Sequence, residues 1–196
     1  LSNTCVQNSE NDAVIPLMTD LDHFEFQAKK EDYYFYVGRL VALKGMDTVM
    51  RLAYEFPERK FVIAGYIQGT ERKHLWFQVK EDGNVRDIHW DEVIEFPNVD
   101  FIGTVGVEEK KGYYMNAKAL LVPTLYSEPF GGVVSEAHAC GTPVISTDWG
   151  AFSENNVHGL TGIRCRTHDC FRKALDEVEK IDPKNCRKYV EDNYSL

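Results

Sequence analysis

Two glutamates, Glu128 and Glu136, stand on either side of the glycine pair Gly131-Gly132. A strand-like apolar run over residues 119–122 precedes them, and an apolar, helix-like run follows. A strand, a glycine turn and a helix N-terminus form an anion site, because free backbone N–H groups and the helix dipole point at the bound group. The glutamates add hydrogen-bond acceptors for hydroxyl groups at each end of that site.

The spacing of the two acids indicates the shape of a ligand. If Gly131 opens the helix, Glu136 lies about 7 Å further along its axis, at about 1.5 Å per residue. This arrangement fits a ligand with a negative middle and hydroxyl groups on both flanks, as a nucleotide diphosphate sugar has. One acid would lie near the sugar and the other near the ribose. The simpler alternative is one loop acid and one acid on a helix surface, with no ligand.

A second turn carries two cations. Gly38, Arg39 and Lys44 follow the apolar run 33–37. Gly38 allows a sharp backbone turn, Arg39 offers a planar fork of donors, and Lys44 is a mobile point charge, so the two cations could neutralise a diphosphate. The alternative is a pair of solvated surface cations. The presence of both turns in one chain favours the phosphate interpretation.

Bulk composition excludes several classes of partner. The chain has 196 residues, of which 43% are hydrophobic, enough for one well-packed domain. The formal net charge of −9 argues against nucleic acid or an anionic membrane as the main partner. No apolar run approaches the roughly 20 residues of a membrane span. We therefore expect no nucleic-acid partner and no direct membrane span.

The five cysteines are odd in number and include no C-x-x-C pair, which favours a reducing compartment over a disulfide framework. The first thirty residues show no signal-peptide pattern. We therefore expect a cytoplasmic location. Because the sequence begins with Leu1 rather than methionine, we also expect it to be a piece of a longer protein.

A cluster of histidines and cysteines suggests zinc as an alternative ligand. It consists of His138, Cys140, Cys165, His168 and Cys170. The H-x-C and C-x-x-H-x-C spacings are irregular for a zinc site, and the helix around His138 has a core-like sequence. We therefore expect no metal site.

Short strands alternate with helices along the chain. Residues 1–32 are predicted to be a lead-in segment, and residues 33–196 a single nucleotide-sugar-binding, Rossmann-like domain. The predicted strands are Tyr33–Val37, Phe61–Ala64, Val99–Ile102, Ala119–Val122, Val144–Ser146 and Leu160–Ile163. The predicted helices are Gly45–Phe56, Glu71–Lys80, Glu108–Asn116, Gly132–Ala139 and His168–Lys180.

This alternation predicts an α/β fold in which a parallel sheet is covered by helices on both faces. Ligands of such sheets bind beyond the carboxyl ends of the strands. The turns at 38–39 and 128–132 both lie at such ends, so we expect them to share one site. The charged run 108–111 is interpreted as a solvated helical face.

Four sequence blocks resemble glycosyltransferase family 4. They are Tyr36-Val37-Gly38-Arg39-Leu40 with Lys44-Gly45, Glu128-Pro129-Phe130-Gly131 with Glu136-Ala137, Ala139-Cys140-Gly141-Thr142-Pro143-Val144-Ile145, and, more weakly, Thr147-Asp148-Trp149-Gly150 running on to Glu154. Their order and spacing make the resemblance specific. It implies the GT-B fold, in which two Rossmann-like domains face a cleft. This chain resembles the C-terminal, nucleotide-sugar-binding domain.

The resemblance also implies a reaction, namely retaining transfer of a sugar from a nucleotide diphosphate sugar to an acceptor hydroxyl, with no required metal or other cofactor. It implies catalytic roles for Arg39 and Lys44, which would bind the diphosphate, and for Glu128, which would hold the donor sugar without acting as a nucleophile. Glu136 would hold the ribose. Further donor contacts are implied for Gly38, for Val105 near the base, and for the backbone N–H groups of Phe130, Gly131 and Gly132.

The chain departs from the family's pattern in three places. Gly132 stands where a larger apolar residue is usual, Trp149 and Ala151 replace a small residue and a second glycine, and the glycine that usually follows Gly65 closely comes only at Gly69.

Transfer by such a fold needs a second domain for the acceptor, which 196 residues do not include. We expect that N-terminal domain in a longer form of this chain or in another chain. Two alternatives remain open. One is a non-catalytic nucleotide-sugar-binding module or a subunit of a two-chain transferase, and the other is a GT-B-type epimerase.

Overall fold

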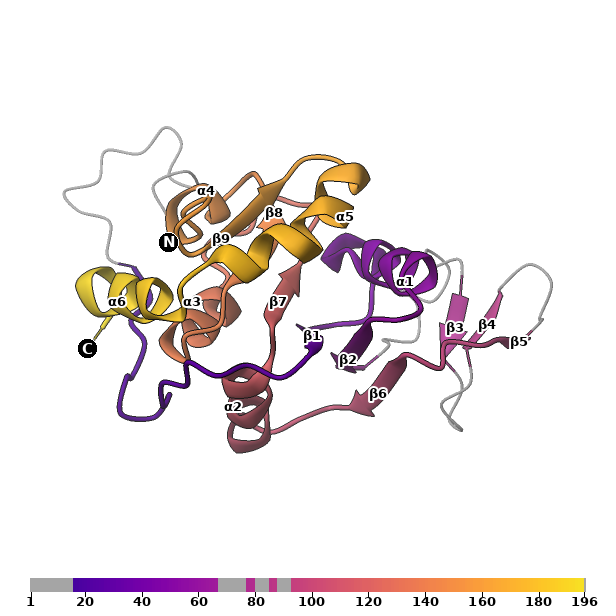
Figure 1. Ribbon diagram of the computed structural model, residues 1–196, viewed down its shortest axis with the longest axis horizontal. Coiled ribbons are helices and arrows are strands. Elements are labelled where there is room, and N and C mark those ends of the chain that lie inside the picture. Colours follow the sequence, from indigo (N-terminus) through magenta and orange to yellow (C-terminus); the bar gives the residue numbers. More distant parts are fainter. Residues whose placement is uncertain (1–15, 67–76, 80–84, 88–92, 196) are drawn as a thin grey trace.

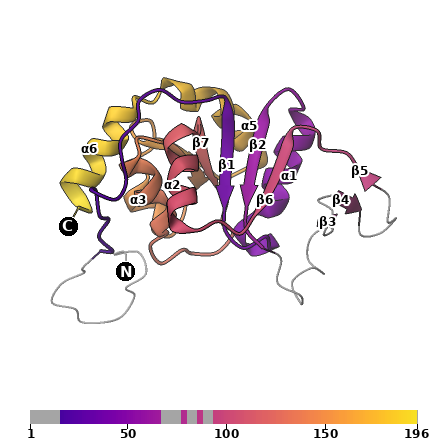
Figure 2. The same cartoon turned by 90° about the horizontal axis from the view of Figure 1, so that it is seen from below.

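The computed structural model describes residues 16–66, 77–79, 85–87 and 93–195. Six strands form its centre: β1 (Tyr33–Val37), β2 (Lys60–Ala64), β6 (Val99–Gly103), β7 (Ala119–Val122), β8 (Val144–Thr147) and β9 (Gly162–Cys165). They make one parallel sheet in the order β6-β2-β1-β7-β8-β9 (Figure 1). Figure 2 shows β6, β2, β1 and β7 side by side in this order. Most of these strands are continuous apolar runs, as expected where both faces of a parallel sheet are buried.

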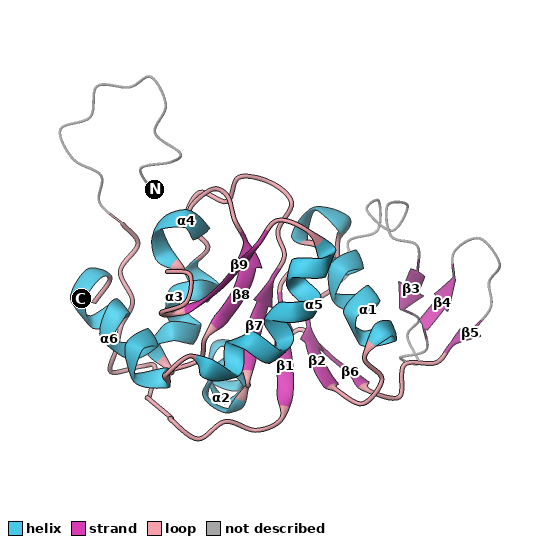
Figure 3. Cartoon of the chain, turned by 45° about the horizontal axis from the view of Figure 1, so that its top comes forward, coloured by secondary structure: helices cyan, strands magenta, loops and turns pink. Residues whose placement is uncertain are grey.

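Helices cover both faces of this sheet (Figure 3). They are α1 (Met46–Glu55), α2 (Val107–Asn116), α3 (Gly132–Ala139), α4 (Phe152–Asn155), α5 (His168–Glu177) and α6 (Pro183–Asn193), with 3₁₀ turns at Ala42–Lys44 and Val178–Lys180. The apolar sides of α1 and α5 fill one core, and those of α2, α3 and α4 fill the other. Tyr34 and Tyr36 of β1 belong to the first core, and Tyr33 and Phe35 to the second. The predicted fold class is confirmed.

The order of the strands places the site. From β1 the chain adds β2 and β6 on one side of the sheet, and then β7, β8 and β9 on the other. Where the strand order reverses, the connections leave a crevice beyond the carboxyl ends of the two central strands. Side chains that follow β1 and β7 therefore meet at the middle of one sheet edge.

Two predicted elements are wrong in part. The strand predicted at Leu160–Ile163 lies two residues later, as β9, because residues 157–161 form a turn in which Thr161 N donates to Val157 O (2.9 Å). Of the helix predicted at Glu71–Lys80, residues 77–79 instead form strand β3 (Phe77–Val79). Its Phe-Gln-Val sequence alternates apolar and polar residues, which suits a strand. The rest of that prediction lies outside the described residues.

A second, antiparallel sheet follows β2 in the chain. In it β3 pairs with β4 (Val85–Asp87), and β4 pairs with β5 (Val93–Ile94). In the sequence, this small sheet comes between β2 and β6, which pair with each other in the main sheet. The sequence did not predict this sheet, nor α4 or α6. A signal for α6 was present, because Asp182 accepts a hydrogen bond from Lys184 N (2.9 Å) as its N-cap and Pro183 opens the helix.

The last part of the predicted lead-in is attached to the domain by Lys30. Lys30 Nζ donates to the carbonyl oxygens of Met115 (2.9 Å) and Cys140 (3.0 Å), at the ends of α2 and α3, and to Thr142 Oγ1 (2.8 Å). Burial of the ammonium group lowers the pKa of Lys30 to about 8. The segment thus ties two helices together, while the boundary at residue 32 stays a prediction.

Thr19 lies beside the other end of the described chain. Its backbone N–H donates to Tyr194 O (2.6 Å), and it forms a β-bridge with Ser195. Its hydroxyl donates to Ser135 Oγ of α3 (2.9 Å). The points at which the chain enters and leaves this domain are therefore side by side.

We expect His138 to make the protein less stable in mild acid. The side chain is fully buried in α3, and burial lowers its pKa from 6.5 to about 3. Below pH 6.5 the unfolded chain binds a proton at His138, whereas the folded chain does not. The free energy of unfolding therefore falls by about 1.4 kcal/mol for each pH unit below 6.5. Urea unfolding at pH 7.0 and 5.5 should show this fall, and the His138→Gln variant should lose about 1.4 kcal/mol less across that interval. An equal fall in both proteins would contradict the assignment.

Candidate functional site

A pocket of about 170 Å³ opens at the carboxyl ends of β1 and β7. It is lined by Tyr36, Val37, Gly38, Lys44, Leu121, Val122, Thr124, Glu128, Gly131, Gly132 and Val133. The structure thus brings together five of the residues that the sequence predicted for the site: Gly38, Lys44, Glu128, Gly131 and Gly132.

Gly131 shapes the floor of this pocket. Its backbone is left-handed (φ 75°), and it is the N-cap of α3, with no side chain capping the first turn. A Cβ at Gly131 would lie 2.8 Å from the ring of Phe152, so a larger residue fits neither the conformation nor the space. Val134 N donates to Gly131 O (2.8 Å), so the N–H groups of the two residues before it are the ones that an anion would use.

Lys44 and Glu128 form the charged centre of the pocket. Lys44 Nζ lies 2.7 Å from Glu128 Oε2, and the hydroxyl of Tyr126 donates to the same oxygen (2.8 Å). Lys44 also lies 4.7 Å from the centre of the Tyr126 ring, within range of a cation–π interaction. Burial acts to lower the pKa of Lys44, but its hydrogen bonds to Glu128 and Tyr126 outweigh burial and raise it. Lys44 is therefore a fixed positive charge at neutral pH.

A close contact between two loops brings this cluster together. Gly45, with φ 75°, lies so near Pro123 that a Cβ would overlap the Pro123 carbonyl oxygen. Beside it, Leu125 N donates to Leu43 O (2.8 Å). The loop after β1, which carries Lys44, is thereby held against the loop after β7.

Glu136 lies in the second turn of α3, outside the 170 Å³ pocket, and is held by α2. Its Oε2 accepts from the hydroxyl of Tyr114 (2.9 Å) and lies 2.8 Å from Lys110 Nζ. Tyr114 is fully buried, and burial, followed by the nearby Glu136 charge, raises its pKa well above 10.0. Lys110 belongs to the run interpreted as a solvated face, yet only 18% of its side chain is exposed, so that interpretation was wrong for this residue.

Three further predicted residues lie around the pocket rather than in its lining. The hydroxyl of Tyr36 donates to Arg39 O (2.7 Å), which fixes the backbone at Arg39. Val105 follows β6, directly before the N-cap of α2. Phe130 is nearly buried and meets Tyr194 edge to face, with ring centres 5.6 Å apart. All three follow a strand at its carboxyl end, as the site residues in the pocket do.

The sequence matches the family described as "Glycosyl transferases group 1" over residues 19–195. The chain belongs to this family. It is 34% identical over 148 residues to D-inositol 3-phosphate glycosyltransferase of Mycobacterium leprae, an alignment that covers 74% of this chain and 32% of that protein. This chain thus spans about a third of that relative.

Solved structures have the same fold as this glycosyltransferase-family chain. Anabaena Alr3699/HepE in complex with UDP has a TM-score of 0.72 at 16% identity, covering 91% of this chain and 52% of that one. The C-terminal domain of a glycosyl transferase group 1 family protein (LpcC) from Francisella tularensis has a TM-score of 0.65 at 18% identity, covering 91% of this chain and 99% of that one. The expected relation to GT-B glycosyltransferases is confirmed.

The fourth family block packs against the loop that carries Glu128. Gly150 (φ 61°) lies so close that a Cβ would come within 2.6 Å of Glu128 N. Ala151 N donates to Glu128 O (2.9 Å), and Asp148 pairs with Arg164 (3.0 Å). This block therefore supports the backbone that positions the acid.

Tyr126, Lys110 and Tyr114 are site residues that sequence reasoning missed. Tyr126 stands two residues before Glu128, and this closeness in sequence was the available signal. Lys110 and Tyr114 are four residues apart and share a helix face, which could have indicated a common partner. In the described part of the chain, no three His, Cys, Asp or Glu side chains lie close enough to hold a metal ion. None of the described helices is long and apolar enough to cross a membrane.

We expect Gly45→Ala to destabilise the protein by at least about 2 kcal/mol, because it adds both left-handed strain and overlap with backbone. Gly103→Ala is the matched control, since Gly103 has φ 72° but no atom of the described residues lies within 4 Å of its Cβ position. That control should cost only about 1–2 kcal/mol of backbone strain. Urea unfolding of both variants gives the comparison, and equal losses would mean that the Pro123 contact is not tight.

Proposed function

We propose that this chain binds a nucleotide diphosphate sugar and is the donor half of a retaining glycosyltransferase, which transfers the sugar to an acceptor hydroxyl. The observation that carries the proposal is the Lys44–Glu128 pair (2.7 Å) beside the uncapped N-terminus of α3. A cation and a helix N-terminus suit the diphosphate, and the adjoining carboxylate suits the sugar hydroxyls.

In this proposal the diphosphate lies between Lys44 and the first turn of α3, and Arg39 adds a planar fork of donors from the turn after β1. Breaking the bond between sugar and phosphate leaves extra negative charge on the diphosphate. Positive groups that are already in place stabilise this charge without rearrangement. Because these residues supply that stabilisation, we propose that transfer needs no metal ion.

Glu128 holds the sugar rather than attacking it. Lys44 and Tyr126 both bind its Oε2 (2.7 and 2.8 Å), so this oxygen is a poor nucleophile. An oxygen of the leaving phosphate then takes the proton of the acceptor hydroxyl as the new bond forms on the same face of the sugar. The configuration at the sugar carbon is thereby retained. Glu136, on the far side of the helix N-terminus, accepts from the ribose hydroxyls.

The acceptor site is proposed to lie outside this chain, in an N-terminal domain of a longer form or in another chain. The chain spans 32% of the M. leprae relative and 52% of Anabaena HepE. Because HepE is described in complex with UDP and with UDP-glucose, uridine nucleotides are the first ligands to test. A non-catalytic nucleotide-sugar-binding module is the alternative, and it would bind the same donors without supporting transfer.

We also propose a cytoplasmic setting, since nucleotide sugars and free thiols are compatible there. In the described part of the chain the cysteines are free, and three of the four are buried. The four cysteines are Cys140, Cys165, Cys170 and Cys186.

We expect calorimetric titration with UDP, GDP, ADP and their glucose or mannose forms to show binding of one nucleotide class. Arg39→Ala and Glu136→Ala should each weaken that binding at least 10-fold, about 1.4 kcal/mol, because each removes a charged contact. Lys188→Ala is the control, since Lys188 is exposed on α6. This variant should bind the nucleotide as tightly as the unaltered chain does. The titration repeated with EDTA should give the same affinity.

Binding that survives in both site variants would overturn the donor assignment. Robust sugar transfer by this chain alone would overturn the placement of the acceptor site in another domain.

We expect Tyr126→Phe to weaken binding of the nucleotide sugar about 2- to 10-fold, because one hydrogen bond to Glu128 is lost. Binding of the nucleotide diphosphate alone should weaken less, since only the sugar meets Glu128, although Lys44 also loses its contact with the Tyr126 hydroxyl. Tyr189→Phe is the control, because its hydroxyl donates to Glu154 O (2.5 Å), away from the pocket. Equal weakening for nucleotide and nucleotide sugar would show that Tyr126 does not act through the sugar contact.

A further inference from the structure

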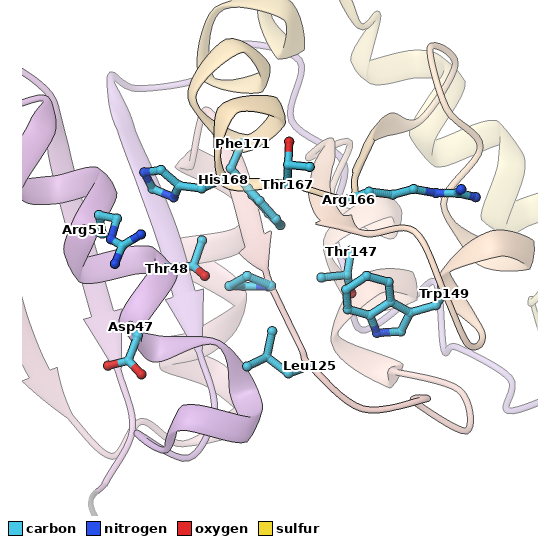
Figure 4. A pocket seen from close by; sticks show the side chains of 11 residues that line it. Asp47, Thr48, Arg51, Leu125, Thr147, Trp149, Arg166, Thr167, His168 and Phe171 are labelled. Atoms are coloured by element: carbon cyan, nitrogen blue, oxygen red, sulfur yellow. The ribbon is translucent and has the colours of Figure 1, made fainter. Parts of the chain in front are cut away.

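A second pocket, of about 220 Å³, lies behind the donor pocket at the same sheet edge. Four segments line it: α1 (Asp47, Thr48, Arg51), the loop after β7 (Pro123, Leu125), the loop after β8 (Thr147, Trp149) and the start of α5 (Arg166, Thr167, His168, Phe171). Figure 4 shows Arg51 and Thr48 along one wall and Thr147 and Trp149 along the opposite wall. None of these residues belongs to the donor lining, so this is a separate cavity.

Hydrogen-bond donors dominate the polar lining of this pocket. Arg51 has no ion pair or hydrogen bond among the residues that the structure describes, unlike Arg166, which pairs with Asp148 (2.7 Å). The indole N–H of Trp149 is shielded from water and lacks an acceptor in the same part of the chain. The unsatisfied Trp149 N–H costs free energy, which an oxygen atom of a ligand recovers, while Arg51 is exposed and accessible to an anion.

Positive potential also comes from α5, the helix that begins at His168. The N-terminus of the ten-residue helix α5, whose N-cap is Thr167, also opens on the pocket. Arg51 provides the planar fork that matches a phosphate group.

The volume and the single carboxylate of the lining narrow the ligand further. A volume of about 220 Å³, equal to that of about seven liquid waters, holds a phosphate group and the few atoms next to it. Asp47 offers up to four lone-pair sites, so it can accept from a ligand hydroxyl as well as from a protein group.

We propose that this pocket binds the phosphate group of a small hydroxylated compound, with Arg51 as its principal ligand. The site is distinct from the donor site but shares a wall with it. Pro123 and Leu125 line the second pocket, Thr124 lines the donor pocket, and Thr147 Oγ1 donates to Thr124 O (2.8 Å). A compound held there lies next to the loop that positions Glu128.

The test is an NMR titration that follows the indole resonance of Trp149, assigned with Trp149→Phe. The probes are glycerol 3-phosphate, inorganic phosphate and, as the uncharged control, glycerol. We expect glycerol 3-phosphate to shift the Trp149 resonance saturably. Inorganic phosphate should bind at least threefold more weakly, and glycerol should cause no shift. Arg51→Met should weaken binding at least 10-fold, and Arg51→Lys, which keeps the charge but not the fork, less than that.

Further variants separate this site from the donor site. Lys173→Met removes a neighbouring, exposed cation of α5 outside the pocket and should leave the titration unchanged. Lys44→Met should also leave it unchanged, while Arg51→Met should leave nucleotide-sugar binding unchanged. Shifts that persist in Arg51→Met, that disappear in Lys44→Met, or that never arise would overturn the second site. None of these results decides the donor assignment, which is tested separately with Arg39→Ala and Glu136→Ala.

Discussion

The approach of Gly45 to the carbonyl group of Pro123 is the contact on which the rest of the site depends. It joins the loop that leaves β1 to the loop that leaves β7, the two central strands of the sheet. Through it Lys44 comes to lie opposite Glu128, although the two are 84 residues apart in sequence. The contact needs a residue with no side chain and a left-handed backbone, and glycine alone satisfies both conditions without strain. The same loop then separates the donor pocket from the second pocket.

Charge balance is the second organising principle of the site. Glu128 is paired with Lys44, and Glu136 with Lys110, each cation coming from a different element of the fold. A buried charge without a partner is costly, so these pairs keep the empty site stable in a chain of net charge −9. Under the proposed function, a phosphate ligand competes with Glu128 for Lys44, and binding becomes an exchange of partners. Such an exchange costs less than bringing a bare charge into a half-buried pocket.

Much of this arrangement can be predicted from the sequence, because it depends on local patterns. The apolar run of β1, the glycines at 131 and 132 and the strand before Glu128 fixed the sheet, the helix start and the side of the sheet that carries the site. The partners of the two acids were missed, since the local spacing around Lys110 and Tyr126 does not show that the fold brings them to Glu136 and Glu128. The β3–β5 sheet was missed because strands of two or three residues carry too little periodicity to detect. The second pocket was equally inaccessible, because its lining comes from four segments spread over residues 47–171.

Because Thr19 pairs with Tyr194 and Ser195, the first and last parts of the described domain lie side by side. A short linker could join these two points, so the domain is suited to circular permutation, with new termini opened in a surface turn. For any neighbouring domain, the same geometry means that both covalent connections run through one spot. A domain attached there would be joined to this one at a single place.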